Sequence, residues 1–260
     1  MCTVTIIKSQ GGGFRMVASR DECPDRPRAT LPRWKNNIAG DARAVWPIDG
    51  LAGGTWVAAG EHGLVLTVLN VNLADPPRPS EDRRISRGSI IPQLIGLPDA
   101  CAAAAALAEL ELDRFDPFRL VGVDRLDGLR IIESRWDGCS LHTVELGAGP
   151  ACFASSGLGD EHVKPRLPLF EEMVVQPGPT PERQDAYHAH RWADRPEISV
   201  LMERPGARTI SVTRIELRPV AGETESGGGS PDSRRRFEVE MDYEAVGATD
   251  PAIPAVAQRG

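Results

Sequence analysis

Short runs of β-branched and aliphatic residues, separated by turn-forming residues, recur along most of this 260-residue chain. Such runs are typical of β-strands, and a glycine-rich turn between two of them is typical of a hairpin. The first hairpin is predicted from residues 2–8 and 14–19, joined by glycines 11–13. A second hairpin and a series of later strands are predicted over 55–60, 64–72, 118–124, 128–135, 139–146, 150–155, 197–203, 207–218 and 235–244.

Three segments in the middle of the chain have helical character. The Ala/Leu/Glu-rich segment 98–112 predicts the clearest helix, because these residues have high helix propensity. Segments 159–176 and 180–193 are also expected to be helical, although Pro165 and Pro168 interrupt the first. Strands at both ends of the chain with helices between them predict an α+β layered domain built on antiparallel sheets.

We expect residues 1–245 to form a single domain, because the chain shows no internal repeat and no linker between two cores. The Pro-rich segments 24–32 and 73–88 are expected to be loops. The low-complexity segment 223–234 is expected to be a flexible hairpin loop, and residues 246–260 a disordered tail.

Composition narrows the classes of function. The net charge is -7 and the sequence pI is about 5.4, which does not fit a nucleic-acid-binding protein with a basic surface. No apolar run is long enough to span a bilayer, and the first residues lack the apolar segment of a secretory signal. Five cysteines without a Cys-x-x-Cys or a His/Cys cluster predict neither a disulfide framework nor a zinc site. We therefore expect a cytoplasmic protein that needs no metal or cofactor.

Cys2 is the first residue with a distinctive chemical setting. A small second residue permits removal of the initiator methionine, which would leave a thiol and a free α-amine on Cys2. The ordinary pKa of an α-amine is about 7.7–8.0, so a share of it is neutral near pH 7 and can deprotonate the thiol. One residue would then supply both nucleophile and base. The alternative interpretation is a small buried hydrophobic residue at the start of a strand.

The predicted hairpin brings charged residues next to Cys2. If its two strands pair, Ser19-Arg20-Asp21-Glu22 at the end of the second strand lies beside the thiol. The guanidinium of Arg20 would lower the thiol pKa, and the carboxylate of Asp21 would anchor and orient the α-ammonium. The alternative is a solvated, charged turn.

Three further polar residues occur at predicted strand ends. Asn70 is a candidate donor to a developing oxyanion, an interaction worth roughly 3–4 kcal/mol. Ser156 is a candidate for lining a site, and Arg208 for holding a substrate anion or supporting Cys2. The alternatives are, in the same order, a turn-forming asparagine, an ordinary loop and a surface arginine.

Taken in order, these residues resemble the NRDE family, also called the transport and Golgi organisation two family. The chain has Met1-Cys2, and it has Ser19-Arg20-Asp21-Glu22, followed by Arg26-Pro27, where the family has its Asn-Arg-Asp-Glu signature. The matches run from residue 1 to about 215. The other matching segments are Gly53-Gly54-Thr55-Trp56, Leu69-Asn70, Ser86-Arg87-Gly88, Phe118–Asp124, Ala154-Ser155-Ser156-Gly157-Leu158 and Ala207-Arg208-Thr209.

The resemblance implies a four-layer αββα sandwich of antiparallel sheets, as in the N-terminal nucleophile hydrolases. The family's pattern is similar to that of the bile-salt hydrolase and penicillin acylase group. The site residues of that group correspond by motif to Cys2, Arg20, Asp21, Asn70 and Arg208. That group's second asparagine falls on Ser156, which weakens the expectation of ordinary amidase activity. Ser156 and Trp56 are expected to contact the substrate.

These observations leave three hypotheses. The first is an N-terminal-cysteine hydrolase that acts on an amide or related acyl bond of a small molecule. The second, implied by the resemblance, is a non-catalytic protein on the same fold that binds or carries a lipid-like ligand, acyl-CoA or haem. The third is a structural or interaction protein in which Cys2 is inert.

Overall fold

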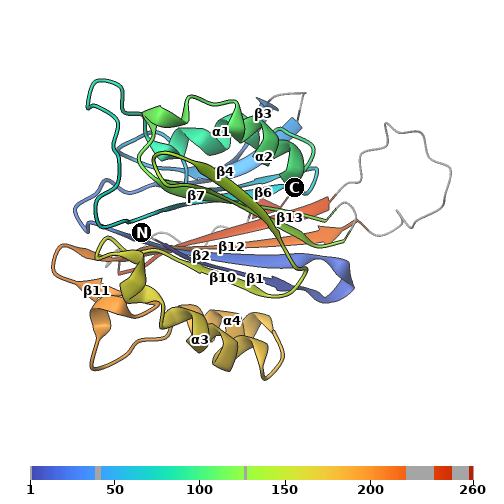
Figure 1. The fold of residues 1–260 in the computed structure, drawn as a ribbon. Coiled ribbons are helices and arrows are strands. Elements are labelled where there is room, and N and C mark those ends of the chain that lie inside the picture. Colours follow the sequence, from blue (N-terminus) through green and yellow to red (C-terminus); the bar gives the residue numbers. More distant parts are fainter. Residues whose placement is uncertain (1, 39–41, 126–127, 221–236, 248–257, 260) are drawn as a thin grey trace.

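The protein has four layers in the order helix, sheet, sheet, helix (Figure 1). The computed structural model describes residues 2–38, 42–125, 128–220, 237–247 and 258–259. Each sheet has seven strands, and all paired strands run antiparallel. The predicted α+β fold, a four-layer αββα sandwich of antiparallel sheets, is confirmed.

The first sheet carries the amino-terminal hairpin at its centre. Its strand order is β10-β1-β2-β12-β13-β14, with β11 paired to β12. Residues 2–8 form a strand because β-branched side chains suit a pleated, buried surface. The strands of this sheet are β1 (Cys2–Lys8), β2 (Phe14–Glu22), β10 (Ala151–Ala154), β11 (Glu203–Arg204), β12 (Ala207–Pro219), β13 (Phe237–Ala245) and β14 (Gln258–Arg259).

The second sheet is a meander in which each strand pairs with the next one along the chain. Its strands are β3 (Thr30–Ile38), β4 (Ala42–Ile48), β5 (Val57–Gly60), β6 (Val65–Asn70), β7 (Phe118–Asp124), β8 (Arg130–Trp136) and β9 (Leu141–Leu146). Consecutive antiparallel strands can be joined by a short turn, but the connection from β6 to β7 is long and contains two α-helices.

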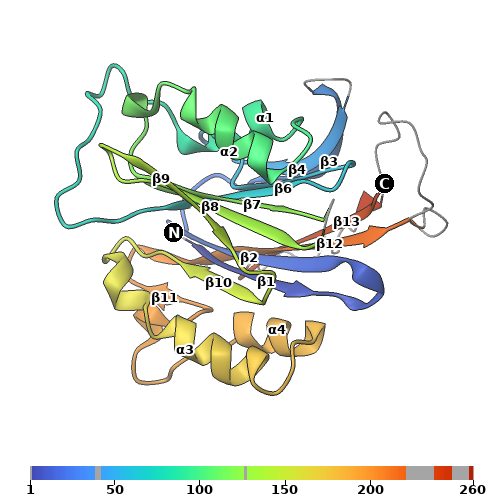
Figure 2. The ribbon, with the colours of Figure 1, turned by 45° about the vertical axis from the view of Figure 1, so that its right-hand side comes forward.

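Helices cover the outer face of each sheet (Figure 2). Over the second sheet lie α1 (Ile90–Leu94) and α2 (Ala100–Ala108), and over the first lie α3 (Arg166–Phe170) and α4 (Pro181–His188). Short helices with other hydrogen-bonding patterns are η1 (Gln10–Gly12), η2 (Arg87–Ser89), η3 (Leu112–Arg114), η4 (Asp160–Val163), η5 (Glu171–Val175) and η6 (Pro196–Ile198).

Alternation along β1 divides the interior into two parts. Cys2, Val4 and Ile6 belong to the large hydrophobic cluster between the sheets, whereas Ile7 belongs to a smaller cluster against α3 and α4. Residues at odd positions of β1 thus point to the helices, because side chains on a strand alternate between its two faces. The single domain expected over residues 1–245 stays a prediction, and the cluster shared by both sheets supports it.

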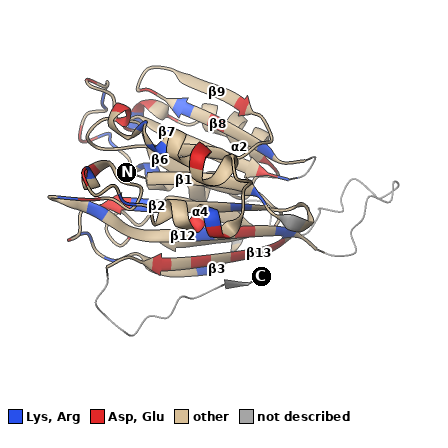
Figure 3. Cartoon of the chain, turned by 90° about the horizontal axis from the view of Figure 1, so that it is seen from below, with Lys and Arg blue, Asp and Glu red and all other residues tan. Residues whose placement is uncertain are grey.

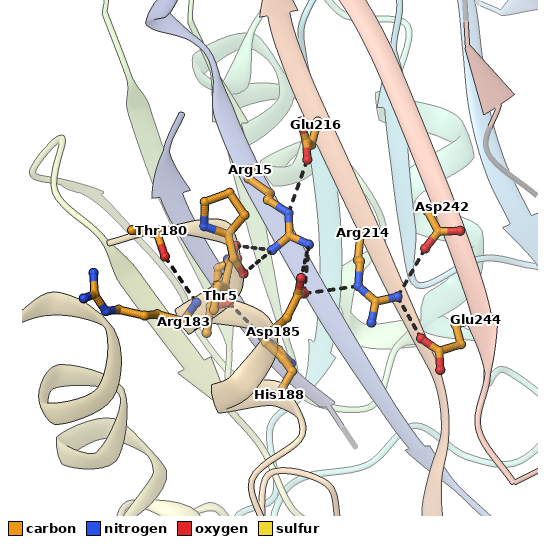
Figure 4. A network of polar contacts seen from close by, with 12 residues as sticks. Thr5, Arg15, Thr180, Arg183, Asp185, His188, Arg214, Glu216, Asp242 and Glu244 are labelled. Carbon is orange, nitrogen blue, oxygen red and sulfur yellow. Dashed lines mark hydrogen bonds and ion pairs between the residues drawn. The ribbon is translucent and has the colours of Figure 1, made fainter. Parts of the chain in front are cut away.

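The face of the first sheet toward α4 is unusually polar. His188 contacts Thr5 Oγ1 through Nε2 at 2.8 Å and Ser19 Oγ through Nδ1 at 2.7 Å. Arg15 pairs with Asp185 at 2.8 Å (Figure 4). Both His188 and Arg15 are buried, and these contacts supply the hydrogen bonds that burial of polar groups requires. Farther along this sheet, the charged residues of β13 are all acidic, whereas β12 carries both basic and acidic residues (Figure 3).

Several predicted elements differ from those observed. The strand predicted over 197–203 is wrong, because the segment contains only the end of η6 and the start of β11. Its apolar residue Val200 is buried against the helices, and the backbone bonds locally, with Leu201 N donating to His190 O at 3.0 Å. An apolar run here marks burial, not a strand.

Two strands were also not predicted, and one predicted helix is divided near the prolines noted in its sequence. β3 covers part of the segment expected to be a loop, since Pro32 is tolerated on an edge strand. β4 was not predicted at all. The helix predicted over 159–176 is divided into η4, α3 and η5, with Pro165 as the cap of α3.

The loop predicted over 223–234 lies outside the described residues. So does most of the tail predicted over 246–260, although Gln258–Arg259 form β14 beside β13.

Candidate active site

Cys2 lies at the first position of β1, held by main-chain contacts on both sides. It pairs with Arg20 of β2, as the predicted hairpin requires. On its other side Cys2 N donates to Ser155 Oγ at 3.2 Å, and Ser155 N donates to Cys2 O at 2.9 Å. The residue is only 6% exposed, and it lines a cavity of about 180 Å³. We call this space the Cys2 cavity.

The Cys2 cavity is polar around the thiol. Arg20 and Glu22 of β2 and Asn70 at the end of β6 line it together with the thiol. The rest of the wall comes mainly from segments 49–56 and 86–88. Among the described residues that line the cavity there is no histidine.

The thiol of Cys2 needs a base before it can act as a nucleophile. Burial raises its pKa, Asp21 raises it further, and the charge of Arg20 lowers it. A raised pKa leaves the thiol protonated at neutral pH, and the thiolate is the reactive form. The two carboxylates in the cavity, Glu22 and Asp49, are both paired with arginines, so neither is a free base.

Arg20 is fixed beside the thiol by an anion and an aromatic ring. Its guanidinium forms a short ion pair with Asp49 and lies 3.9 Å from Glu22. It also lies 4.2 Å from the centroid of the Trp56 ring, a cation–π distance. Trp56 therefore supports Arg20 from within the cavity wall, in addition to its predicted role in substrate contact.

Asp49 is the centre of this charge cluster. Its carboxylate accepts two hydrogen bonds from Arg26, both at 2.9 Å, in addition to the contact with Arg20. It also accepts from the backbone of Leu51 at 3.1 Å and of Ala52 at 2.7 Å. Burial opposes ionisation, but these hydrogen bonds and the two arginines together lower the pKa of Asp49. It is therefore an anion that orients the arginines.

Gly54 and Gly88 allow two segments of the cavity wall to pack closely against each other. Thr55 N donates to Gly88 O at 2.9 Å, which joins the segment 53–56 to 86–88. A β-carbon on Gly54 would come within 2.8 Å of Gly88 Cα and closer still to its carbonyl group. Only glycine permits this approach of two backbones. The contact holds Arg87 at the cavity, with Nη1 donating to Pro117 O at 2.9 Å.

Asp21 lies on the opposite face of the sheet from the thiol. Asp21 Oδ1 accepts from Thr209 Oγ1 at 2.6 Å, and Oδ2 lies 3.6 Å from Arg166 Nη1. The carboxylate is fully buried, and within the described part of the chain Oδ2 accepts no hydrogen bond. Burial raises the pKa of Asp21, opposed by Arg166 and Thr209. Asp21 is thus near the main chain of Cys2 but not in the cavity.

Two other predicted residues do not line the Cys2 cavity. Arg208 of β12 is the cross-strand partner of Glu22 in β2, and Glu22 does line the Cys2 cavity. Ser156 is buried within its own turn, where its nitrogen donates to Asp160 Oδ1 at 3.0 Å and its oxygen accepts from Leu158 N at 3.2 Å. The neighbour Ser155, not Ser156, contacts Cys2.

Sequence reasoning assigned no role to Arg26, Asp49 or Arg166. Arg26 belongs to the segment that resembles the family, and this was a signal that could have given it a role. Asp49 and Arg166 gave no such signal, because the sheets alone bring them to Arg20 and Asp21. Within the described residues, no group of three or more His, Cys, Asp or Glu residues could hold a metal ion. No helix in the described ranges is long and apolar enough to cross a membrane.

Comparison with known proteins bears on the part of the chain that contains this cavity. The family model for transport and Golgi organisation 2 (TANGO2) matches residues 1–165. That range includes Cys2, Arg20, Asp21 and Asn70, but not Arg208. No curated protein matches the chain by sequence.

Solved structures share the fold at low identity. Penicillin V acylase from Agrobacterium tumefaciens matches with TM-score 0.51 and 12% identity, over 98% of this chain and 84% of that one. The N-acylethanolamine-hydrolyzing acid amidase ortholog of Caenorhabditis elegans matches with TM-score 0.53 and 10% identity, over 82% of this chain and 92% of that one. A variant of conjugated bile acid hydrolase from Clostridium perfringens matches with TM-score 0.54 and 11% identity, over 99% of this chain and 92% of that one. The chain thus has the fold of N-terminal nucleophile hydrolase-like acylases, and likeness at this identity shows the fold alone.

Proposed function

The chain belongs to the transport and Golgi organisation 2 family, and we propose that it is an N-terminal-cysteine hydrolase that cleaves an amide or related acyl bond. The observation that carries the proposal is the placement of Cys2. The residue is the first of β1, its thiol lines a cavity with Arg20 and Asn70, and its nitrogen contacts Ser155.

The missing base is the α-amine of Cys2, freed by removal of Met1. A buried thiol with a raised pKa requires such a base, and the carboxylates of the cavity are paired with arginines. The proton of the thiol passes to the amine, and the sulfur attacks the carbonyl carbon of the substrate. The electron pair of the carbonyl moves to its oxygen, and Asn70 donates a hydrogen bond to that oxygen.

Collapse of this intermediate breaks the carbon–nitrogen bond. The leaving amine takes the proton from the α-ammonium, and a thioester with Cys2 remains. Water then loses a proton to the α-amine and attacks the thioester, which releases the acid and restores the thiol. The neighbouring residues position these groups: Arg20 favours the thiolate, and Asp21 holds the α-ammonium through Oδ2, which accepts no hydrogen bond within the described part of the chain.

Two roles expected from the sequence are placed differently in the proposal. Arg208 acts on the cavity through Glu22, its cross-strand partner. Ser156 shapes the loop beside Cys2, while Ser155 holds the nitrogen of Cys2.

The experiment compares protein that lacks Met1 with protein that retains it, each verified by intact mass. A fluorogenic N-acyl amide measures turnover, and mass spectrometry of the quenched reaction detects an acyl adduct. We expect turnover and an adduct on Cys2 only in the Met1-free protein, and neither in Cys2→Ala. Cys101→Ala is the control, because Cys101 is an exposed thiol away from the cavity. Tight binding of the amide without adduct or turnover would contradict the proposal in favour of a carrier.

We also propose that the protein works in the cytoplasm. All five cysteines are free, which suits a reducing compartment. Fractionation of cells that express the tagged chain tests this location.

A further inference from the structure

A second cavity of about 580 Å³ lies next to the Cys2 cavity. We call it the outer cavity. Asn70 lines the Cys2 cavity, and Val71 and Asn72, which follow it directly, line the outer one. Arg87 lines both. The two spaces therefore meet at the end of β6, with the guanidinium of Arg87 between them.

Arg87 differs from the other two arginines of the Cys2 cavity in having no ion-pair partner within the described part of the chain. Arg20 and Arg26 are paired with Asp49, and both also lie near Glu22. Among the described residues no carboxylate lies within 4.0 Å of the Arg87 guanidinium. Its hydrogen bond goes to a neutral acceptor, the carbonyl oxygen of Pro117.

The carboxylate with the largest effect on Arg87 does not neutralise it. Burial lowers the pKa of Arg87, whereas the charge of Asp116 raises it, with smaller effects from Cys2 and Glu22. Asp116 is engaged with Arg84, whose Nε lies 3.7 Å from Asp116 Oδ1. A half-buried cation at the junction of two cavities is therefore free to bind an anion that enters with a ligand.

The position of Arg87 is fixed by the main chain. The backbone of Gly88 is bonded to Thr55 and packed against Gly54, so residue 87 is anchored directly before a rigid contact. A guanidinium held in this way presents a planar donor set, which matches a carboxylate better than a point charge does.

The surroundings of the outer cavity fit the rest of such a molecule. Leu73 and Leu158, both exposed, contribute apolar surface, and Asn72 and His162 contribute polar groups. The Cys2 cavity, of about 180 Å³, is small compared with ordinary ligand sites of about 300–1,000 Å³, and the outer cavity next to it has room for the rest of a larger ligand.

We propose that the substrate is an amide that carries a carboxylate, and that Arg87 binds this carboxylate while the scissile bond lies at Cys2. This inference rests on the proposed function in taking the ligand to be an amide. The carboxylate belongs either to the amine part or to the acyl part of the amide, and both sources present the same group to Arg87.

The test measures binding, so that it needs no turnover. Full-length Cys2→Ala protein is titrated by calorimetry with N-hexanoylglycine and adipamic acid, which carry the carboxylate on the amine side and on the acyl side. The neutral partners are N-hexanoylglycinamide and adipamide. We expect at least one acid to bind roughly 10- to 100-fold tighter than its neutral partner, the range for a charged hydrogen-bonded pair.

Variants in the same background identify the anchor. Arg87→Gln is expected to remove the preference for the acid, and Arg87→Lys to restore part of it. The matched control is Arg83→Gln on the same segment, where the arginine is exposed and pairs with Asp113, and it should keep the full preference. Equal binding of acid and neutral forms overturns the inference, as does a preference that survives Arg87→Gln. An equal loss of both forms in Arg87→Gln also overturns it, because the role is then structural.

The two proposals fail separately. Charge preference that depends on Arg87, in a protein that hydrolyses none of these amides, supports the anchor and contradicts the hydrolase. Hydrolysis by the Met1-free protein that is indifferent to the carboxylate supports the hydrolase and contradicts the anchor.

Discussion

The substitution Asp49→Asn tests whether the charge cluster beside Cys2 depends on a single carboxylate. Asp49 accepts five hydrogen bonds, three of them from two arginines. Its side chain is 6% exposed, and those of Arg20 and Arg26 are 7% and 22% exposed. The asparagine keeps the shape but removes the charge, which leaves two cations in a largely desolvated site.

Breaking one side of a buried ion pair costs about 3–5 kcal/mol. The lower part of this range applies here, because Arg26 is partly exposed and Glu22 lies 3.6 Å from it and 3.9 Å from Arg20. We therefore expect Asp49→Asn to lower the free energy of unfolding by about 3 kcal/mol at pH 7. Urea denaturation followed by tryptophan fluorescence measures the change.

The matched control is Asp113→Asn, which removes an exposed ion pair with Arg83 and should cost less than about 1 kcal/mol. The pKa of Asp49 is lowered on folding, so its contribution is present above its ordinary pKa of about 4 and is lost as the pH falls below it. The gap between wild type and Asp49→Asn should therefore narrow at acid pH. Equal destabilisation by the two substitutions at pH 7 would refute the reasoning.

Three other predictions follow from buried or close contacts. Gly54→Ala forces a β-carbon into the backbone of Gly88 and should lower the free energy of unfolding by about 2 kcal/mol or more. Gly147→Ala, where the space around the β-carbon is open, should change it very little. Similar urea midpoints for the two variants would contradict this. Burial lowers the pKa of His188 to about 3. As the pH drops below about 6.5, the unfolded state therefore binds a proton that the folded state does not. The free energy of unfolding of wild type should fall by about 2 kcal/mol between pH 7.5 and pH 5. In His188→Gln this slope should disappear, and an unchanged slope would exclude His188 as its source. Asp160→Ala removes two hydrogen bonds that tie the loop 156–160 to Asn72, just after β6, and one hydrogen bond within the loop. It should therefore lower the free energy of unfolding by about 1–3 kcal/mol and speed proteolysis within that loop; unchanged cleavage would count against this role.

The amino-terminal hairpin could be predicted because local pattern and turn chemistry agree there. Runs of β-branched residues flank three glycines, and two of these, Gly11 and Gly12, adopt positive φ in the turn. The pairing of Cys2 with Arg20 follows from that hairpin alone. β3 and β4 could not be found in this way, because Pro32 and Pro47 interrupt them and their pairing shifts register between Thr30 and Arg33.

Asp49 shows why the rest of the site escapes sequence reasoning. It follows β4 directly, in a segment whose residues are typical of any turn. Its partners Arg20 and Arg26 come from the other sheet and the chain that leaves it, so only the stacking of the two sheets creates the cluster. Arg166 is still more distant from Asp21 along the chain and meets it only because α3 covers the first sheet.

The neighbours Arg20 and Asp21 show what strand geometry adds to a motif. Adjacent residues on a strand point to opposite faces, so the two charges cannot both line one cavity. Arg20 lies on the face of the Cys2 thiol, and Asp21 lies on the face of α3 with Thr209 and Arg166. The nitrogen of Cys2 lies in the plane of the sheet, between these faces. In the proposed mechanism, the cation acts on the sulfur from one side and the anion acts on the nitrogen from the other. The separation is incomplete, because Asp21 still raises the thiol pKa from across the sheet. The α-amine of Cys2 must therefore take the proton of a thiol that Asp21 keeps protonated, and the same carboxylate stabilises the ammonium that results.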